Sequence, residues 1–314
     1  MYFPVADIEL NPLIPPALAF VISFFTSMGG VSGAFLLLPF QVSVLGFNSP
    51  AVSATNQLFN IVAIPSGVYR YIKEGRMVWP LTWVVIIGTL PGVLIGAIVR
   101  IRYLPEPRNF KMFVGLVLLY IGCRLLRDIL AKNRTGNGQG ETEEKFQQQV
   151  KDFKAKQDND RLPAVTTRKF NLTCISYDFY GRNFTINTVV VMALSLMVGI
   201  IGGVYGIGGG AIVAPFFITF LGLPVYTVAG AALMGTFITS VAGVIFYQII
   251  APFYPDMAIA PDWLLGFLFG LGGFGGMYCG ARYQKFVPAK TIKWMLTGCI
   301  LLTAAKYVIS FFSW

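Results

Sequence analysis

Histidine is absent from this chain of 314 residues, and acidic side chains are few, with 14 Asp and Glu together. Without an imidazole, histidine-based catalysis, proton relay and metal binding are excluded. The four cysteines include no CxxC pair, so neither a metal site nor a disulfide framework is expected. The sequence also lacks HExxH and paired acidic residues within apolar segments, so we expect no enzyme activity and no cofactor.

Charge is scarce as well. Only 12% of the residues are charged, whereas 55% are hydrophobic, a balance that favours lipid over water as the main solvent. The formal net charge is nevertheless +10. The basic residues lie mostly between apolar runs, as at 70–76 and 282–290, which is typical of membrane-flanking loops and not of a nucleic-acid site. The expected partners are therefore the lipid bilayer and a small solute, with no nucleic acid.

The apolar runs predict membrane helices, each needing about 20 residues to span a bilayer. The first run, 13–47, is too long for one span and is interrupted by Ser27-Met28-Gly29-Gly30-Val31-Ser32-Gly33. We therefore expect two short helices there, at 13–28 and 34–46. The further helices of the first part are predicted at 50–70, 79–99 and 109–128. After a polar stretch, the run 186–221 is broken by glycines at 202–210, and helices follow at 225–250, 262–281 and 290–312.

The polar stretch between the two sets of helices cannot lie in lipid. Its first part, NRTGNGQGETEEKFQQQVKDFKAKQDNDR, is dense in charge, and 141–156 has the composition of a short surface helix. We interpret 132–185 as a solvated linker, with a regulatory or partner-binding role as the alternative. The predicted organisation is a first transmembrane repeat at 1–131, this linker, and a second transmembrane repeat at 186–314.

The two halves are related by a shift of 176 residues. This shift places Gly30 on Gly206, Gly33 on Gly209 and Pro39 on Pro215, and it also aligns Phe40, Gly46 and Val52 with identical residues. The second half carries an insertion near 252–262. If each half has a broken helical pair that enters and returns, followed by three spanning helices, the halves are inverted.

Charge supports that topology. It gathers the basic segments 70–78, 132–185 and 281–293 on one face, which the positive-inside rule places in the cytoplasm. Arg100, Arg102 and Arg108 break the bias. The predicted fold is thus an all-α polytopic protein of the cell (cytoplasmic) membrane. It has two inverted repeats, each with a glycine-broken helical hairpin followed by three transmembrane helices.

Matching glycine breaks in two halves of a membrane protein point to a transport site. Irregular backbone at membrane depth must be buried in protein or line a polar cavity, and a helix that begins there presents N–H groups that suit an anion. Close helix packing is the alternative explanation for the glycines. The candidate substrate-binding residues in these breaks are Gly30, Ser32, Gly33, Gly206, Gly208, Gly209 and Gly210.

Polar side chains in the helices that follow the breaks complete the candidate site. Asn56, Gln57 and Asn60 lie on roughly one face of the helix at 50–70, and Thr236 and Thr239 belong to the corresponding helix of the second half. Such residues bind a ligand or form interhelical hydrogen bonds, and the sequence leaves both open. No carboxylate lies within a predicted helix core, so proton coupling through a protein carboxylate is not expected.

The motifs GGVSGAFLLLPF, LGFNSP and AVSATNQLFN, with their counterparts YGIGGGAIVAPFF and AGAALMGTF, resemble those of the TauE/SafE family of sulfite and organosulfonate exporters. The resemblance covers nearly all of the chain outside the linker. It implies a membrane transporter, most simply an exporter, of a small sulfur-containing anion such as sulfite or a sulfonate. The alternatives are a transporter of another small organic anion and a non-transporting receptor or assembly protein.

Overall fold

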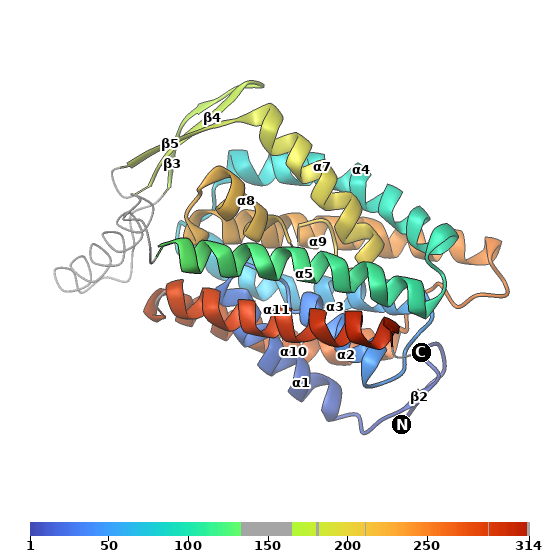
Figure 1. Cartoon of the computed structure of the whole chain (residues 1–314). Coiled ribbons are helices and arrows are strands. Elements are labelled where there is room, and N and C mark those ends of the chain that lie inside the picture. Colours follow the sequence, from blue (N-terminus) through green and yellow to red (C-terminus); the bar gives the residue numbers. More distant parts are fainter. Residues whose placement is uncertain (133–164, 180–181, 211, 288, 313–314) are drawn as a thin grey trace.

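The computed structural model of the chain describes residues 1–132, 165–179, 182–210, 212–287 and 289–312 (Figure 1). It is mostly helical, and the helix bounds agree within a few residues with the predicted segments. The first part contains α1 (Ile14–Met28), α2 (Ala34–Ser43), α3 (Ala51–Lys73), α4 (Trp79–Tyr103) and α5 (Pro107–Lys132). The second contains α7 (Thr188–Tyr205), α8 (Val213–Leu221), α9 (Val225–Ile250), α10 (Trp263–Tyr283) and α11 (Ala289–Phe312).

Five helices in the described ranges are long and apolar enough to cross a bilayer. They occupy Trp79–Tyr103, Pro107–Arg127, Thr188–Tyr205, Thr227–Phe253 and Trp263–Tyr283. α3 and α9 pack against each other, and α3 also packs on α10 while α9 packs on α4. α5 and α11 run side by side across the front of the view in Figure 1.

Glycines end two of the helices. α1 ends at Met28, and Gly30 follows with a φ of 69°. α7 ends at Tyr205, and Gly206 and Gly208 follow with φ angles of 78° and 81°. A residue with a Cβ is strained in this left-handed region, so glycine is the natural residue at these helix ends.

Glycines also let two pairs of helices approach closely. α4 packs along α7 and α10 packs along α1, so each pair joins one helix from each part of the sequence. A Cβ added to Gly92 of α4 would lie 2.6 Å from the Leu196 carbonyl oxygen of α7. A Cβ added to Gly276 of α10 would lie 2.3 Å from the Phe20 carbonyl oxygen of α1. We call these contacts the α4–α7 seam and the α10–α1 seam, and only glycine fits at such separations.

Two small sheets add to the all-α class that was predicted. β1 (Tyr2–Phe3) pairs with β2 (Ile8–Glu9) near the N-terminus. At the end of the predicted linker, and two residues past its bound at 185, β3 (Thr166–Phe170), β4 (Cys174–Phe179) and β5 (Arg182–Asn187) form an antiparallel sheet in that order. The helix that was predicted at 141–156 lies outside the described residues. The end of the linker is thus folded, and α7 follows β5 directly.

The three-stranded sheet docks on the start of α9 through β4. Ile175, Tyr177 and Phe179 alternate along β4 and are buried. The Tyr177 hydroxyl lies 3.1 Å from the Thr227 hydroxyl. Burial raises the pKa of Tyr177 to about 12, so this hydroxyl stays neutral at physiological pH.

Candidate functional site

The candidate site lies where the two helix breaks meet α3 and α9. We call residues 29–33 the first glycine segment and residues 206–210 the second glycine segment. All twelve predicted site residues are buried. The structure brings most of them into one region.

Asn60 of α3 joins both glycine segments to α9. Its side-chain oxygen accepts a hydrogen bond from the Ser32 hydroxyl. Its amide nitrogen donates to the Ile207 carbonyl at 2.9 Å and to the Ser240 hydroxyl at 3.1 Å. One side chain therefore holds together two segments that lie far apart in the sequence.

Asn56 lies one helical turn before Asn60 and makes a second bridge. Its amide nitrogen donates to the Ala34 carbonyl at 3.0 Å, where α2 begins, and to the Gly206 carbonyl at 3.4 Å. Its oxygen accepts from the Gln41 amide at 3.3 Å. Interhelical hydrogen bonding, one of the two roles that the sequence left open, thus describes the asparagines in this conformation.

Gln57 takes a different position, although it neighbours Asn56 in the sequence. Neither atom of its buried amide has a hydrogen-bond partner within the described chain. The side chain packs against α9, where a Cβ added to Gly243 would lie 1.9 Å from the Gln57 oxygen. The predicted face of three amides therefore divides, with Asn56 and Asn60 toward the glycine segments and Gln57 against Gly243.

The second glycine segment rests on the polar side chains of α9. The Gly209 N–H donates to the Thr239 hydroxyl at 3.0 Å. The hydroxyls of Thr236 and Thr239 donate to carbonyls of their own helix, at 2.8 Å from Ala232 and 2.7 Å from Gly235. A Cβ added to Gly210 would lie 2.3 Å from the Ala232 carbonyl oxygen. Both threonines thus line the contact with the segment.

The first glycine segment makes a comparable close contact with α9. A Cβ added to Gly30 would lie 2.6 Å from the Cβ of Ala229. In the second glycine segment, a Cβ added to Gly206 would lie 2.2 Å from the Cβ of Ser53 of α3. A Cβ added to Gly33 would lie 2.5 Å from the Ser23 hydroxyl oxygen of α1. The close packing of glycines that the sequence allowed as an alternative is therefore present at these positions.

The site is electrically neutral in the part of the chain that the structure describes. Amides, hydroxyls and main-chain groups supply its hydrogen bonds, and no acidic or basic side chain bonds to the twelve residues there. Asparagine amides, hydroxyls and N–H groups are all donors that an oxyanion accepts. Binding an anion here requires these donors to exchange their present carbonyl and hydroxyl partners for the ligand.

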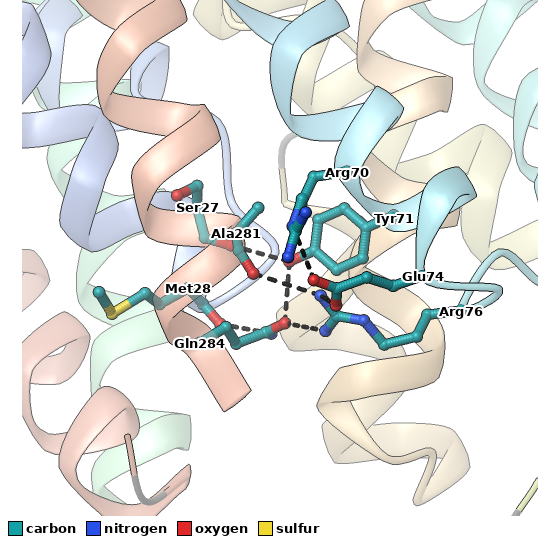
Figure 2. Close-up of polar contacts among 8 residues, drawn as sticks. All are labelled: Ser27, Met28, Arg70, Tyr71, Glu74, Arg76, Ala281 and Gln284. Atoms are coloured by element: carbon teal, nitrogen blue, oxygen red, sulfur yellow. Dashed lines mark hydrogen bonds and ion pairs between the residues drawn. The ribbon is translucent and has the colours of Figure 1, made fainter. Parts of the chain in front are cut away.

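A charged network that the sequence analysis did not predict lies beside the first glycine segment (Figure 2). Arg76, which is 1% exposed, forms an ion pair of 2.6 Å with Glu74. Its guanidinium also donates to the Gln284 side-chain oxygen at 2.6 Å, and Arg70 pairs with Glu74 at 2.7 Å. All charges in this cluster therefore have partners. Gln284 follows Arg76 by 208 residues, so no local pattern reveals the contact.

The network links the ends of α1, α3 and α10. The Gln284 amide, just after α10, donates to the Met28 carbonyl at the end of α1, at 2.7 Å. The Tyr71 hydroxyl of α3 lies 3.2 Å from the Ser27 carbonyl oxygen and 3.1 Å from the Gln284 side-chain oxygen, and its one proton is shared between these two acceptors (Figure 2). Because Met28 directly precedes the first glycine segment, the network holds one end of that segment in place.

Comparison with known proteins places this architecture. The sequence model of the family described as "Sulfite exporter TauE/SafE" matches residues 16–307, which include all of α2 to α10. The chain belongs to this family. Because the described part of the chain contains five helices able to cross a bilayer, it is a multi-pass membrane protein.

Two curated relatives from Bacillus subtilis (strain 168) are similar to parts of the chain. "Probable membrane transporter protein YunE" is 24% identical over 110 residues, which are 35% of this chain and 40% of the relative. "Probable membrane transporter protein YdhB" is 26% identical over 126 residues, which are 40% of this chain and 47% of the relative. The matches thus span less than half of the length of each relative. No solved structure matches the chain.

Proposed function

We propose that the chain is a membrane transporter of a small sulfur-containing anion, such as sulfite or an organosulfonate, and that it exports this anion. The observation that carries the proposal is the meeting of the two glycine segments through Asn56 and Asn60 inside the helical body. The described conformation is closed at that point. The description of the matched family supports the substrate class, and the printed names of both relatives support transport.

The donors at the site fit an oxyanion. The Asn60 amide, the Ser32 hydroxyl and the Gly209 N–H each donate to a neutral protein group in the closed conformation. Separation of the two glycine segments would free these donors toward a shared space, where a sulfite oxygen accepts them. α2 and α8 begin after the two segments, and the positive ends of their dipoles favour an anion there.

The two halves are best explained as inverted repeats, and the seams support this. The α4–α7 seam contains the contacts Gly88–Met192, Gly92–Leu196 and Gly96–Ile200. The α10–α1 seam contains the contacts Gly272–Pro16, Gly276–Phe20 and Gly280–Phe24. A shift of 176 converts the α1 positions into the α7 positions, and a shift of 184 converts the α4 positions into the α10 positions. The difference of about eight residues between the two shifts matches the insertion near 252–262. Equivalent residues of the two halves therefore pair in the same way in both seams.

The proposed function can be tested with purified protein in liposomes by measuring the flux of sulfite, sulfate, a small sulfonate and a carboxylate as control. We expect saturable movement of sulfite or the sulfonate. Asn60→Leu removes the bridge between the segments and should abolish this flux. Gln57→Leu is the matched control, because Gln57 has the same chemistry on the same helix but packs against Gly243. Its flux should remain.

The outcomes separate the alternatives. Selective flux of a different organic anion would retain transport and replace the substrate. No flux of any anion through folded, correctly inserted protein would overturn the transport proposal and favour a receptor or assembly role. In that case deletion of 136–160 would show whether the linker carries the function.

A further inference from the structure

Arg100 is a buried cation without an acidic partner among the residues that the structure describes. It lies near the end of α4, within a helix able to span the membrane, and its exposed fraction is 0%. One guanidinium nitrogen, Nη1, donates to the Leu104 carbonyl. Nε and Nη2 have no hydrogen-bond partner among the described residues, and no ion pair of Arg100 occurs there. A charge inside a membrane protein is costly unless something compensates it, and it commonly marks an ion or substrate path.

The two unpartnered nitrogens have a specific geometry. Nε–H and one N–H of Nη2 point from the same edge of the planar guanidinium. This edge binds two oxygens of one oxyanion at once, as in arginine–carboxylate and arginine–phosphate pairs. The opposite edge is occupied by the Leu104 carbonyl, and the centroid of the Phe110 ring lies 3.8 Å from the guanidinium carbon. The ring and the carbonyl fix the guanidinium plane and leave the bidentate edge free.

Two hydroxyl groups accompany this cation. Tyr247 of α9 is fully buried and lies close enough to Arg100 for the two to interact electrostatically, and the hydroxyls of Tyr247 and Ser53 are both buried without a hydrogen-bond partner among the described residues. Ser53 of α3 in turn abuts the second glycine segment, since a Cβ added to Gly206 would lie 2.2 Å from the Ser53 Cβ. Arg100, Tyr247 and Ser53 thus form one buried group that continues directly into the candidate site.

The repeat relationship allows the surroundings of Arg100 to be compared with the charged network of Figure 2. The shift of 176 places Tyr71 on Tyr247, and the shift of 184 places Arg100 on Gln284. At the Gln284 end, Tyr71 hydrogen-bonds to Gln284 and the charge of Arg76 is paired with Glu74. At the Arg100 end, the cation stands where the neutral amide stands in the other half. One end of the molecule is therefore closed by internal pairs, and the other holds a positive charge that no acidic side chain in the described ranges compensates.

We propose that Arg100, with the hydroxyls of Tyr247 and Ser53, forms an anion subsite that takes one small oxyanion through the Nε–Nη2 edge. The inference rests on the proposed anion transport and extends it. The subsite lies beside the second glycine segment and receives the anion on its way to or from the asparagine site. The chemistry selects a sulfite, sulfonate or comparable oxyanion over chloride, which cannot present two oxygens.

The test compares anion binding by the wild type and by Arg100→Gln, which introduces the residue of the equivalent position in the other half. Purified protein is titrated with sulfite, methanesulfonate and chloride, and the thermal midpoint is followed. The two oxyanions should stabilise the wild type more than chloride does. Arg100→Gln should weaken this effect at least about tenfold in apparent affinity, as expected for a lost charged hydrogen bond. Arg102→Gln, an exposed neighbour on the same helix, is the matched control and should bind as the wild type does.

Two further variants keep the test decisive if Arg100→Gln does not fold. Arg100→Lys keeps the charge but loses the bidentate edge, so it should bind oxyanions more weakly while the preference over chloride shrinks. Tyr247→Phe should weaken binding without removing it. Wild-type oxyanion affinity in the folded Arg100 variants would overturn the subsite. If the wild type also shows flux in that case, the transport proposal stands and the subsite is rejected. If oxyanion binding depends on Arg100 but no flux is seen, the subsite stands and the transport proposal is rejected.

Discussion

At Gly206 the backbone and the packing make separate demands on one residue. Its φ of 78° disfavours any side chain, and an added Cβ would overlap Ser53. Gly46 has nearly the same φ, 74°, but nothing lies within 4 Å of its added Cβ. Gly46 therefore shows backbone strain alone, whereas Gly206 combines backbone strain with a close contact. The sequence does not distinguish the two cases.

We expect Gly206→Ala to cost more stability than Gly46→Ala. The left-handed conformation alone costs roughly 1–2 kcal/mol in both variants. Gly206→Ala must also push α3 away from the second glycine segment, and it should abolish anion flux. Thermal unfolding in detergent and flux in liposomes measure the two effects. Equal stability losses, with flux retained in both variants, would contradict the role of this contact.

The two seams are features of whole helices. Along each one, glycines every four residues bring the backbones of α4 and α7, or of α10 and α1, into contact. Each seam joins one helix from each half, so both seams must stay intact or slide if the halves move. If the seams are rigid, α4 and α7 move as one unit and α10 and α1 move as another, and the two units rock around the glycine segments.

Alanine at a seam glycine should destabilise the protein, whereas alanine at a helical glycine with open space around it should not. Gly92→Ala and Gly276→Ala place a Cβ against a main-chain carbonyl, which cannot yield as a side chain does. Gly298 of α11 has nothing within 4 Å of its added Cβ, and Gly298→Ala should be neutral or gain up to about 1 kcal/mol from helix propensity. Thermal midpoints of the three variants test this. A seam variant as stable as Gly298→Ala would refute the close approach.

Helices were predictable from sequence because each is a long apolar run with its own local signal. The sequence predicted that Asn56 and Asn60 bind a ligand or a neighbouring helix, and it left the two roles open. Gln57 packs against Gly243 instead, a tertiary contact that helix periodicity does not predict. The sheet of β3 to β5 escaped prediction because its strands are short and lie in a polar stretch. The pairing of Arg76 with Gln284 escaped because it joins residues from opposite ends of the chain.

At the scale of the whole molecule, the structure changes the status of one of the three arginines that break the expected charge bias. Arg100 broke the expected positive-inside bias when it was counted as a loop residue. The structure buries it inside α4, so it does not belong to a loop at all. The N-terminus and the end of α11 lie on the right of the view in Figure 1, whereas β3 to β5 lie on the left.

We expect exposed residues of the two faces to be reached from opposite sides of the membrane. In a background with all four cysteines replaced by serine, Asp256→Cys should react with an impermeant maleimide in intact cells. Lys73→Cys should react only after lysis, because inverted halves place 70–78 in the cytoplasm. Both residues are exposed in the structure. Labelling of both from the same side would contradict the inverted arrangement.

The seams also determine when the protein can be completed during synthesis. The ribosome delivers α1 first, yet the helix that covers its contact face, α10, emerges only after most of the chain has been made. Until then the face of α1 that α10 covers lacks its main packing partner. A chain truncated before α10 would keep that surface permanently open, which makes it a substrate for membrane quality control even though nearly all of its spanning helices are present.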